Sequence, residues 1–220
     1  MIDKRKNSNS WKTILTVFIG SALLSGVIIF TMLYFILPEA PQAIYLQGNP
    51  EGIRELSTPR DLVDFTLPAT TGEDLSLSDF HGQSVMLFFG YTYCPDICPL
   101  TLTHIRQTHD LLGEYADDVI FVYITVDPER DTVERLQQYM ILFRIEDYTV
   151  GLVGDDITLQ QILADYSLYY QRHDDEGNNY AVDHTASIYF INEWGQLDTI
   201  FSYGTHPELM AEHILSKIHR

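Results

Sequence analysis

The sequence has few cysteines and, after its first twelve positions, few basic residues. Cys94 and Cys98 are the only two cysteines among 220 residues, and they are four positions apart. Small secreted scaffolds use several disulfides to replace a missing core, whereas a chain of this length can bury a core of its own. Closing so short a loop also restricts the unfolded chain little. A purely structural disulfide is therefore a poor interpretation of this pair.

Basic residues are scarce beyond residue 38, where nine of them stand against 30 acidic residues, a formal charge of −21. A protein that binds nucleic acid needs a basic face to displace counterions, and an anionic membrane surface would repel this part of the chain. Nucleic acid is thus excluded as a partner. The charge itself fits either solubility in the surrounding medium or docking to a basic partner surface.

Charged residues are absent from positions 13–37, a run of 25 residues. A helix of that length rises roughly 37 Å at about 1.5 Å per residue, enough to cross ~30 Å of hydrocarbon with some tilt. The run is too long for the apolar part of a cleaved signal peptide. Because basic residues precede it, the positive-inside rule puts residues 1–12 in the cytoplasm and the rest outside the cell membrane. We expect a single-pass membrane protein.

Residues 38–60 contain four prolines and are predicted to form a linker, followed by an exported domain at residues 61–220. Patterns of apolar residues predict its elements: a β-hairpin over 64–80, strands over 84–91, 119–127, 150–153, 184–191 and 197–204, helices over 99–115, 131–143 and 158–168, and a last helix from 205. This order predicts a thioredoxin-like α/β domain, a central mixed sheet covered by helices on both sides.

Two local patterns lead to further expectations. The sequence "DTVE" at 131–134 predicts a capping box, with Asp131 as the N-cap and Glu134 at the third helical position. Residues 169–183 are polar and acidic, and we expect a loop there. Loops of this length inside compact domains tend to be functional or mobile.

Cys94 and Cys98 directly follow the first buried strand, where a helix is expected to begin. Open α/β sheets bind ligands at the carboxyl ends of their strands. The free N–H groups and positive dipole end of a helix favour thiolate over thiol, which prepares either a nucleophile or a metal ligand. The spacing alone does not distinguish a redox couple from a soft-metal site.

A histidine close to the cysteines would favour copper. Two thiolates leave Cu(I) under-coordinated, and a neutral imidazole also allows a site to hold Cu(II). Of the eight histidines, seven are expected to have surface or capping roles. His184 differs because it leads into a predicted buried strand, at the place where thioredoxin-like domains bring a loop against the cysteine turn. On spacing alone, a ligand and an ordinary strand residue are equal alternatives for it.

The motifs "FFGYTYCPDICP", "TVDPERDT" and "VDHT" occur in the order and spacing of the Sco/SenC family of membrane-anchored copper chaperones, which the chain resembles from about residue 60 to residue 220. The resemblance implies one N-terminal membrane span, an exported thioredoxin-like domain, and one copper ion bound by Cys94, Cys98 and His184. It also implies a role in assembling the copper A centre of cytochrome c oxidase, by delivering copper or by reducing that centre's cysteines. Other copper carriers and thiol reductases are further partners for such a protein.

Three other positions are compared with the family. Asp127 matches an acid that lies close to the metal site in the family. It would then either support a metal ligand or contact a docking partner. The alternative is a solvated acid at the end of a strand. The segment 169–183 matches one that in the family is mobile and brings the histidine to the cysteines. Tyr93 is a departure, since many members have histidine there, but the copper ligands do not depend on it.

The main alternative is an extracytoplasmic thiol–disulfide oxidoreductase that uses no metal. Oxidoreductases of this fold have a C-x-x-C turn opposed by a cis-proline, whereas this chain has C-x-x-x-C, and "VDHTAS" contains no proline. The wider spacing still permits disulfide chemistry, so a combination of both activities stays open. A peroxidase of related fold is a weaker alternative, because it needs one peroxidatic cysteine rather than a chelating pair.

Overall fold

The structure is a computed structural model, and it describes residues 52–173 and 180–218. The predicted cytoplasmic tail and the predicted transmembrane helix at 13–37 lie outside these described residues. Within them, none of the helices combines the length and the apolar character needed to span a bilayer.

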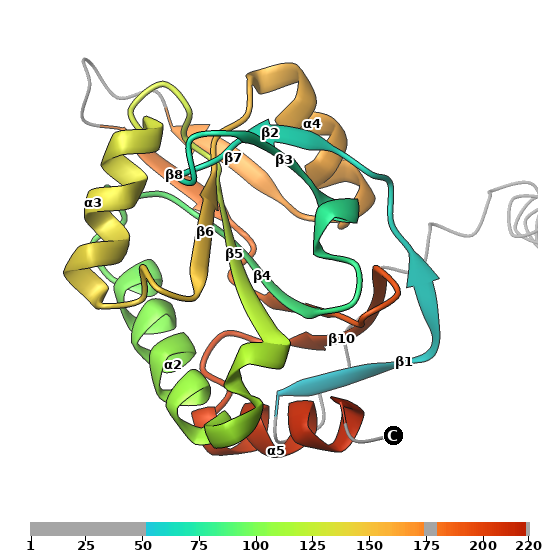
Figure 1. The fold of residues 1–220 in the computed structure, drawn as a ribbon. Coiled ribbons are helices and arrows are strands. Elements are labelled where there is room, and N and C mark those ends of the chain that lie inside the picture. The colour runs from blue at the N-terminus through green and yellow to red at the C-terminus, as the bar shows by residue number, and fades with distance from the viewer. Residues whose placement is uncertain (1–51, 174–179, 219–220) are drawn as a thin grey trace, which may run out of the picture. The chain divides into compact units, whose positions relative to one another are not determined.

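A mixed six-stranded sheet forms the centre of the domain, in the order β1-β10-β9-β4-β5-β6 (Figure 1). Strands β4, β5 and β6 run parallel, whereas β9, β10 and β1 pair antiparallel with their neighbours. The strands of this sheet are β1 (Ile53–Asp61), β4 (Ser84–Gly90), β5 (Val119–Thr125), β6 (Thr149–Leu152), β9 (Ile188–Ile191) and β10 (Gln196–Phe201). The predicted central mixed sheet of a thioredoxin-like domain is confirmed.

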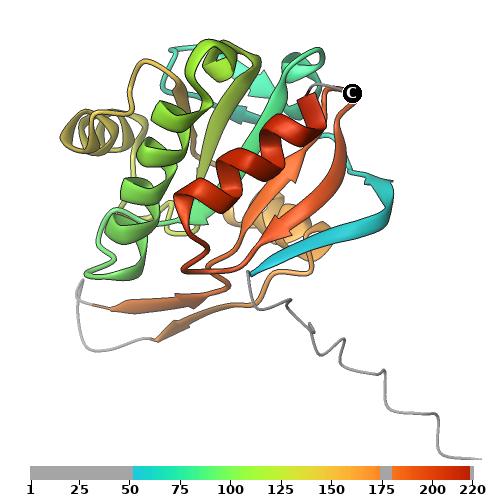
Figure 2. The same ribbon diagram turned by 90° about the horizontal axis from the view of Figure 1, so that it is seen from below.

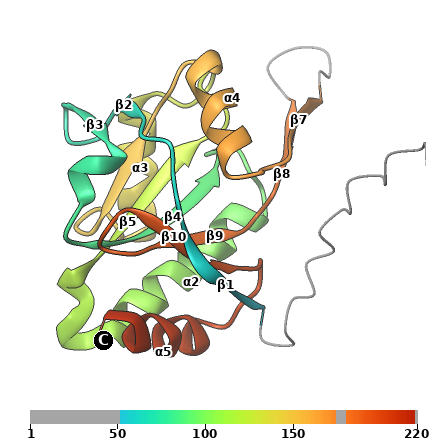
Figure 3. The same ribbon diagram turned by 90° about the vertical axis from the view of Figure 1, so that its right-hand side faces the viewer.

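Helices cover both faces of this sheet. Helix α2 packs against α3 and α5, and Figure 2 shows α2 and α5 side by side on one face. Helix α4 lies across the sheet from α5, near the hairpin β2–β3 (Figure 3). The helices and the hairpin strands are α2 (Ile97–Leu112), α3 (Val133–Phe143), α4 (Asp156–Asp165), α5 (Pro207–Ile218), β2 (Thr66–Pro68) and β3 (Asp74–Ser76), with short 3-10 helices at Leu77–Phe80 and Gly113–Asp118.

Strand β4 is buried along its whole length, since all seven of its residues are buried. It pairs in parallel with β5 from Ser84 opposite Val119 to Gly90 opposite Thr125, and antiparallel with β9 on its other side. Its apolar run "SVMLFFG" fits this central place, since a parallel strand covered on both faces needs apolar side chains at almost every position. The residues after Gly90 therefore emerge at the carboxyl edge of the parallel strands.

The N-terminal edge of the sheet differs from the prediction. Residues 53–60, expected in the linker, belong to β1, which pairs antiparallel with β10. Lys217 of α5 binds Glu55 of β1 at 2.5 Å and Asp198 of β10 at 2.8 Å, which ties the strand to the domain. The sequence does not mark this strand clearly, because it is largely polar and contains Pro59, which sheets accept in edge strands and at bulges.

The polar segment predicted as a loop at 169–183 instead contains two short strands, β7 (Tyr170–His173) and β8 (Ala181–His184). They pair antiparallel, with Tyr170 opposite His184, in a ribbon separate from the central sheet. His184 thus ends β8, whereas the prediction placed it at the start of the following strand. Four-residue polar strands have too little periodicity to be distinguished from a loop.

Helix α3 begins after a different cap from the one predicted. Thr132 is its N-cap, and its hydroxyl accepts a hydrogen bond from the Arg135 backbone N–H at 3.2 Å. Asp131 is fully buried instead. Its carboxylate accepts hydrogen bonds from the N–H and hydroxyl of Thr92, at 2.9 and 2.6 Å, and from the hydroxyl of Thr125, at 2.7 Å. Asp131 thereby fixes the loop after β4 to the end of β5.

We expect Thr132→Ala to lower the free energy of unfolding by about 1 kcal/mol, the usual loss for a helix cap. Asp131→Ala should cost about 3 kcal/mol or more, because it leaves the three buried donors of Thr92 and Thr125 without their acceptor. Urea unfolding followed by circular dichroism measures both values. Equal losses in the two variants would contradict the buried role assigned to Asp131.

Candidate metal centre

Cys94 and Cys98 lie where the chain passes from β4 to α2, with Cys98 in the first turn of the helix. The backbone N–H of Cys98 donates to the Cys94 sulfur at 3.4 Å. Asp96 directly precedes the helix, yet in the part of the chain that the structure describes its side chain makes no capping hydrogen bond. The Cys94 sulfur therefore takes the place of a capping oxygen, and the helix terminus stabilises its negative charge.

The two cysteines differ in their readiness to ionise. A hydrogen bond from the Cys98 thiol, helped by backbone N–H groups, lowers the pKa of Cys94 to about 3. The same pairing with Cys94, together with burial, raises the pKa of Cys98, whose side chain is 0% exposed. At neutral pH, Cys94 is thus a thiolate that accepts a hydrogen bond from the Cys98 thiol.

His184 approaches the cysteines from the end of β8. Its Nε2 lies 3.8 Å from the Cys98 sulfur, and its Nδ1 lies 3.1 Å from the backbone oxygen of Thr185. A carbonyl oxygen only accepts, so Nδ1 carries the hydrogen and a neutral ring keeps its lone pair on Nε2, toward the sulfur. Metal-binding histidines are commonly oriented by such a hydrogen bond from their second nitrogen.

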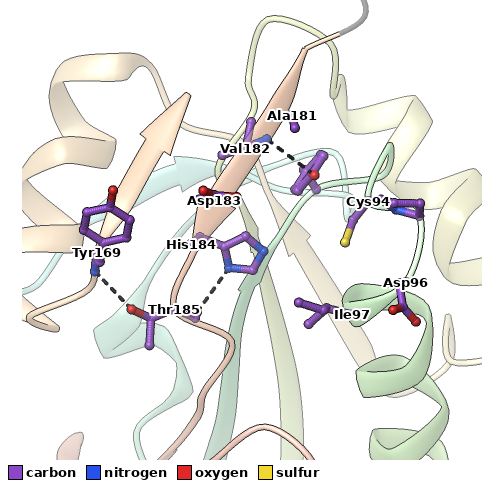
Figure 4. A pocket seen from close by; sticks show the side chains of 11 residues that line it. Cys94, Asp96, Ile97, Tyr169, Ala181, Val182, Asp183, His184 and Thr185 are labelled. Carbon is purple, nitrogen blue, oxygen red and sulfur yellow. Dashed lines mark hydrogen bonds between the residues drawn. The ribbon is translucent and has the colours of Figure 1, made fainter. Parts of the chain in front are cut away.

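An open pocket of about 510 Å³ lies between the start of α2 and the β7–β8 hairpin (Figure 4). Figure 4 shows the Cys94 sulfur and the His184 ring facing each other across it. Tyr91, Ile97 and Tyr169 line the same pocket. Cys98 is fully buried, so Cys94 is the sulfur that an incoming molecule reaches first.

The donor set fits a soft metal, although the three side chains do not yet surround an ion. Among residues 52–173 and 180–218, no three histidine, cysteine or acidic side chains form a ready-made ligand cluster. The 3.8 Å between the Cys98 sulfur and the His184 Nε2 nevertheless suits two ligands of one ion. With the bond lengths known for zinc, about 2.3 Å to sulfur and about 2.0 Å to nitrogen, and an angle of roughly 120°, two such ligands lie about 3.7 Å from each other. Two thiolates and one imidazole are a donor set for copper.

Asp127 is 3% exposed, so it is not the solvated acid that one interpretation of the sequence described. One carboxylate oxygen accepts a hydrogen bond from the hydroxyl of Tyr180, and the other binds the guanidinium of Arg130. Tyr180 stands four residues before His184 in the chain. The carboxylate of Asp127 is thus directed at the residues that support His184.

Two other histidines are less exposed than the surface roles predicted for them. The ring of His109 stacks on that of Tyr148 with centroids 3.5 Å apart, and burial lowers the pKa of His109. The Nε2 of His213 lies 2.9 Å from the hydroxyl of Thr199. Both histidines pack against other elements of the domain, and neither lines the pocket.

Several residues that support the site were missed from the sequence, above all Arg130 and Tyr180. Their contacts join segments 50 residues apart, and no local periodicity reports such a pairing. The one available signal was the cluster of charges in "DPERDT" directly after a buried strand. Charged side chains at the carboxyl end of a parallel strand are well placed to face a site.

In the reduced, metal-free protein, we expect alkylation of Cys94 by iodoacetamide to proceed at a constant rate between about pH 5 and about pH 8. A pKa of about 3 keeps this cysteine a thiolate throughout, whereas an ordinary thiol would react roughly tenfold faster for each added pH unit. Cys98→Ala removes the largest cause of the shift, so it should raise the pKa of Cys94 and restore the pH dependence. Peptide mass spectrometry measures the rates. A rate that climbs steadily with pH in the unaltered chain would contradict the thiolate assignment.

A profile of the SCO1/SenC family matches residues 53–219. The human mitochondrial protein SCO1 homolog is 32% identical over 209 residues, which cover 93% of this chain and 65% of the human protein. The structure of Bradyrhizobium japonicum ScoI with copper bound aligns with a TM-score of 0.65 at 30% identity, over 71% of this chain and 99% of that one.

BsSco, described as a member of the Sco family of cytochrome c oxidase assembly proteins, aligns with a TM-score of 0.58 at 20% identity, over 76% of this chain and 96% of that one. At this identity the likeness supports the fold alone. The family profile covers most of the chain, including the cysteine turn and His184. The chain therefore belongs to the SCO1/SenC family.

Proposed function

We propose that this protein is a copper chaperone that binds one copper ion through Cys94, Cys98 and His184. The observation that carries this proposal is the orientation of His184, whose Nε2 is directed to the Cys98 sulfur by the hydrogen bond between its Nδ1 and the Thr185 carbonyl. A dithiol that only exchanges disulfides has no need for an imidazole held in this way. The copper in Bradyrhizobium japonicum ScoI supports the choice of metal.

Loading requires both cysteines in the reduced state. Cys94 is already a thiolate, whereas Cys98 must release its proton when copper binds, so binding releases acid. Oxidation of the pair to a disulfide removes both sulfur ligands, and copper occupancy is thereby coupled to redox state. Because Cys94 lines the open pocket, a thiolate from a recipient protein reaches the ion from that side and can replace the chaperone's ligands one after another.

The recipient we propose is the copper A subunit of cytochrome c oxidase. This chain belongs to the SCO1/SenC family, and BsSco is described as a member of the Sco family of cytochrome c oxidase assembly proteins, which supports this choice. Asp96 and Asp183 lie at the pocket, in a chain of formal charge −18, which favours a recipient with a basic face around its metal ligands. The uncharged run at residues 13–37 would anchor the domain to the outer face of the membrane.

A thiol–disulfide reductase is the second candidate, favoured by the unequal cysteines. In that reaction the Cys94 thiolate attacks one sulfur of a partner disulfide, which forms a mixed disulfide and releases the partner's other sulfur as a thiolate. Cys98 then loses its proton and attacks the Cys94 sulfur, which frees the second partner thiol. Both electrons come from this chain, and the Cys94–Cys98 disulfide is the product.

Copper titration of the reduced full chain, in competition with a chelator, should show one tightly bound equivalent. We expect Cys94→Ser, Cys98→Ser and His184→Ala each to weaken binding by more than about 100-fold, since even the loss of a residue that only supports a metal ligand costs 10- to 100-fold. His173→Ala is the matched control, because His173 lies in the same hairpin but binds Asp183 at 2.7 Å. Unchanged affinity in Cys98→Ser would show that this site is wrong.

The two candidates respond differently to the loss of His184. A reductase keeps its activity toward a disulfide peptide in His184→Ala, because both thiols are retained. A copper chaperone loses transfer to a copper-free copper A subunit in the same variant. Comparison of peptide reduction with copper transfer in one preparation separates them, and intact transfer by His184→Ala would contradict the chaperone mechanism.

A further inference from the structure

Arg130 contacts both halves of the candidate metal centre. It lies in the turn after β5, and its side chain is only 8% exposed. Its Nε binds the carboxylate of Asp127, and its Nη1 donates to the backbone carbonyl of Tyr180 at 2.9 Å. Tyr180 directly precedes β8, the strand that ends in His184. Arg130 therefore joins the end of β5 to the base of the hairpin.

The same guanidinium lies over aromatic rings from two different segments. Its central carbon is 3.5 Å from the centre of the Tyr180 ring and 4.7 Å from that of Tyr93, the residue before Cys94. A planar guanidinium can stack flat on rings while its N–H groups make hydrogen bonds at its edge, whereas the ammonium group of lysine has no plane to stack. One side chain thus connects the loop that carries Cys94 to the hairpin that carries His184.

The hairpin depends strongly on such contacts because β7 and β8 form a two-stranded ribbon outside the central sheet. A ribbon of two short strands is marginally stable by itself. Another link to the cysteine side is the hydrogen bond from the Val182 N–H to the Tyr91 hydroxyl, and at 3.5 Å it is long. The hydrogen bond from Arg130 Nη1 to the Tyr180 carbonyl is shorter, at 2.9 Å, and the buried ion pair with Asp127 holds the guanidinium in place to make it.

We propose that Arg130 is a positioning residue that holds the β7–β8 hairpin, and with it His184, over the cysteine turn. Release of Tyr180 by Arg130 would withdraw the imidazole and open the pocket above Cys94. For copper, this proposal rests on the function proposed above, and its consequence is that Arg130 slows the exchange of copper with other molecules. The covering of Cys94 is independent of any metal.

The first test uses the reduced, metal-free full chain. Arg130→Lys keeps the positive charge near the cysteines but loses the stacking, so the hairpin should open more often and alkylation of Cys94 by iodoacetamide should accelerate about tenfold. The matched control is Arg60→Lys, because Arg60 forms an ion pair with Asp165 away from the pocket. Circular dichroism confirms folding of each variant. An unchanged alkylation rate in folded Arg130→Lys would overturn the proposal.

The second test follows copper loss from the loaded chain to a chelator. Arg130→Lys should speed this loss about tenfold in the unaltered chain, but less than about twofold in a His184→Ala background, because Arg130 acts through that histidine. Equal acceleration in both backgrounds would show that Arg130 merely stabilises the fold.

If the unaltered chain bound no copper, the proposed function would fail, while alkylation would still decide the role of Arg130. If Arg130→Lys did not fold, Tyr180→Leu would remove the stacked ring from the hairpin side while keeping the backbone carbonyl, and it is held to the same outcomes.

Discussion

The site depends on the complete burial of β4 in the middle of the sheet. This strand has neighbours on both sides and helices on both faces, so the chain can reach the surface only beyond its carboxyl end. Helix α2 begins there. The Cys94 sulfur accepts hydrogen bonds from the thiol and the backbone N–H of Cys98 at the start of that helix, so Cys98 prepares the thiolate before any partner arrives. Asp131 stabilises the same turn by accepting hydrogen bonds from the backbone N–H and the hydroxyl of Thr92.

The proposed third ligand reaches this turn from a much weaker element. His184 is carried by a ribbon outside the central sheet, and its position depends on side-chain contacts rather than on a continuous β-ladder. This contrast suits a carrier protein. Two sulfurs on a rigid strand–helix junction can retain an ion, and an imidazole on a weakly attached hairpin can leave when the ion is passed on.

The sequence was sufficient to predict the strands with a strong pattern of apolar residues and the position of the cysteines next to one of them. The buried runs of β4 and β5, the hairpin β2–β3 and the placement of Cys94 and Cys98 at the carboxyl end of β4 could all be predicted, because each depends on local pattern or on strand direction. The approach of His184 to the cysteine turn was expected from the likeness to thioredoxin-like domains. By contrast, β1 is polar and occupies an edge, and β7 and β8 are four residues each. Neither pattern differs enough from a linker or a loop.

The buried polar contacts could not be predicted for another reason. Asp131 has the sequence context of a helix cap, and only the folded chain reveals that Thr92 and Thr125 occupy its oxygens. Arg130 and Tyr180 meet across 50 residues through a stacked ring and a backbone carbonyl. Such pairings are set by tertiary packing, which propensities and hydrophobic periodicity do not describe.

X-ray absorption spectroscopy at the copper edge, on the copper-loaded full chain, tests the three-ligand centre most directly. We expect a coordination sphere of two sulfurs and one imidazole nitrogen, with the nitrogen component absent from His184→Ala. A sphere of sulfur ligands alone in the unaltered chain would show that His184 does not bind the ion, and would contradict the proposed metal centre.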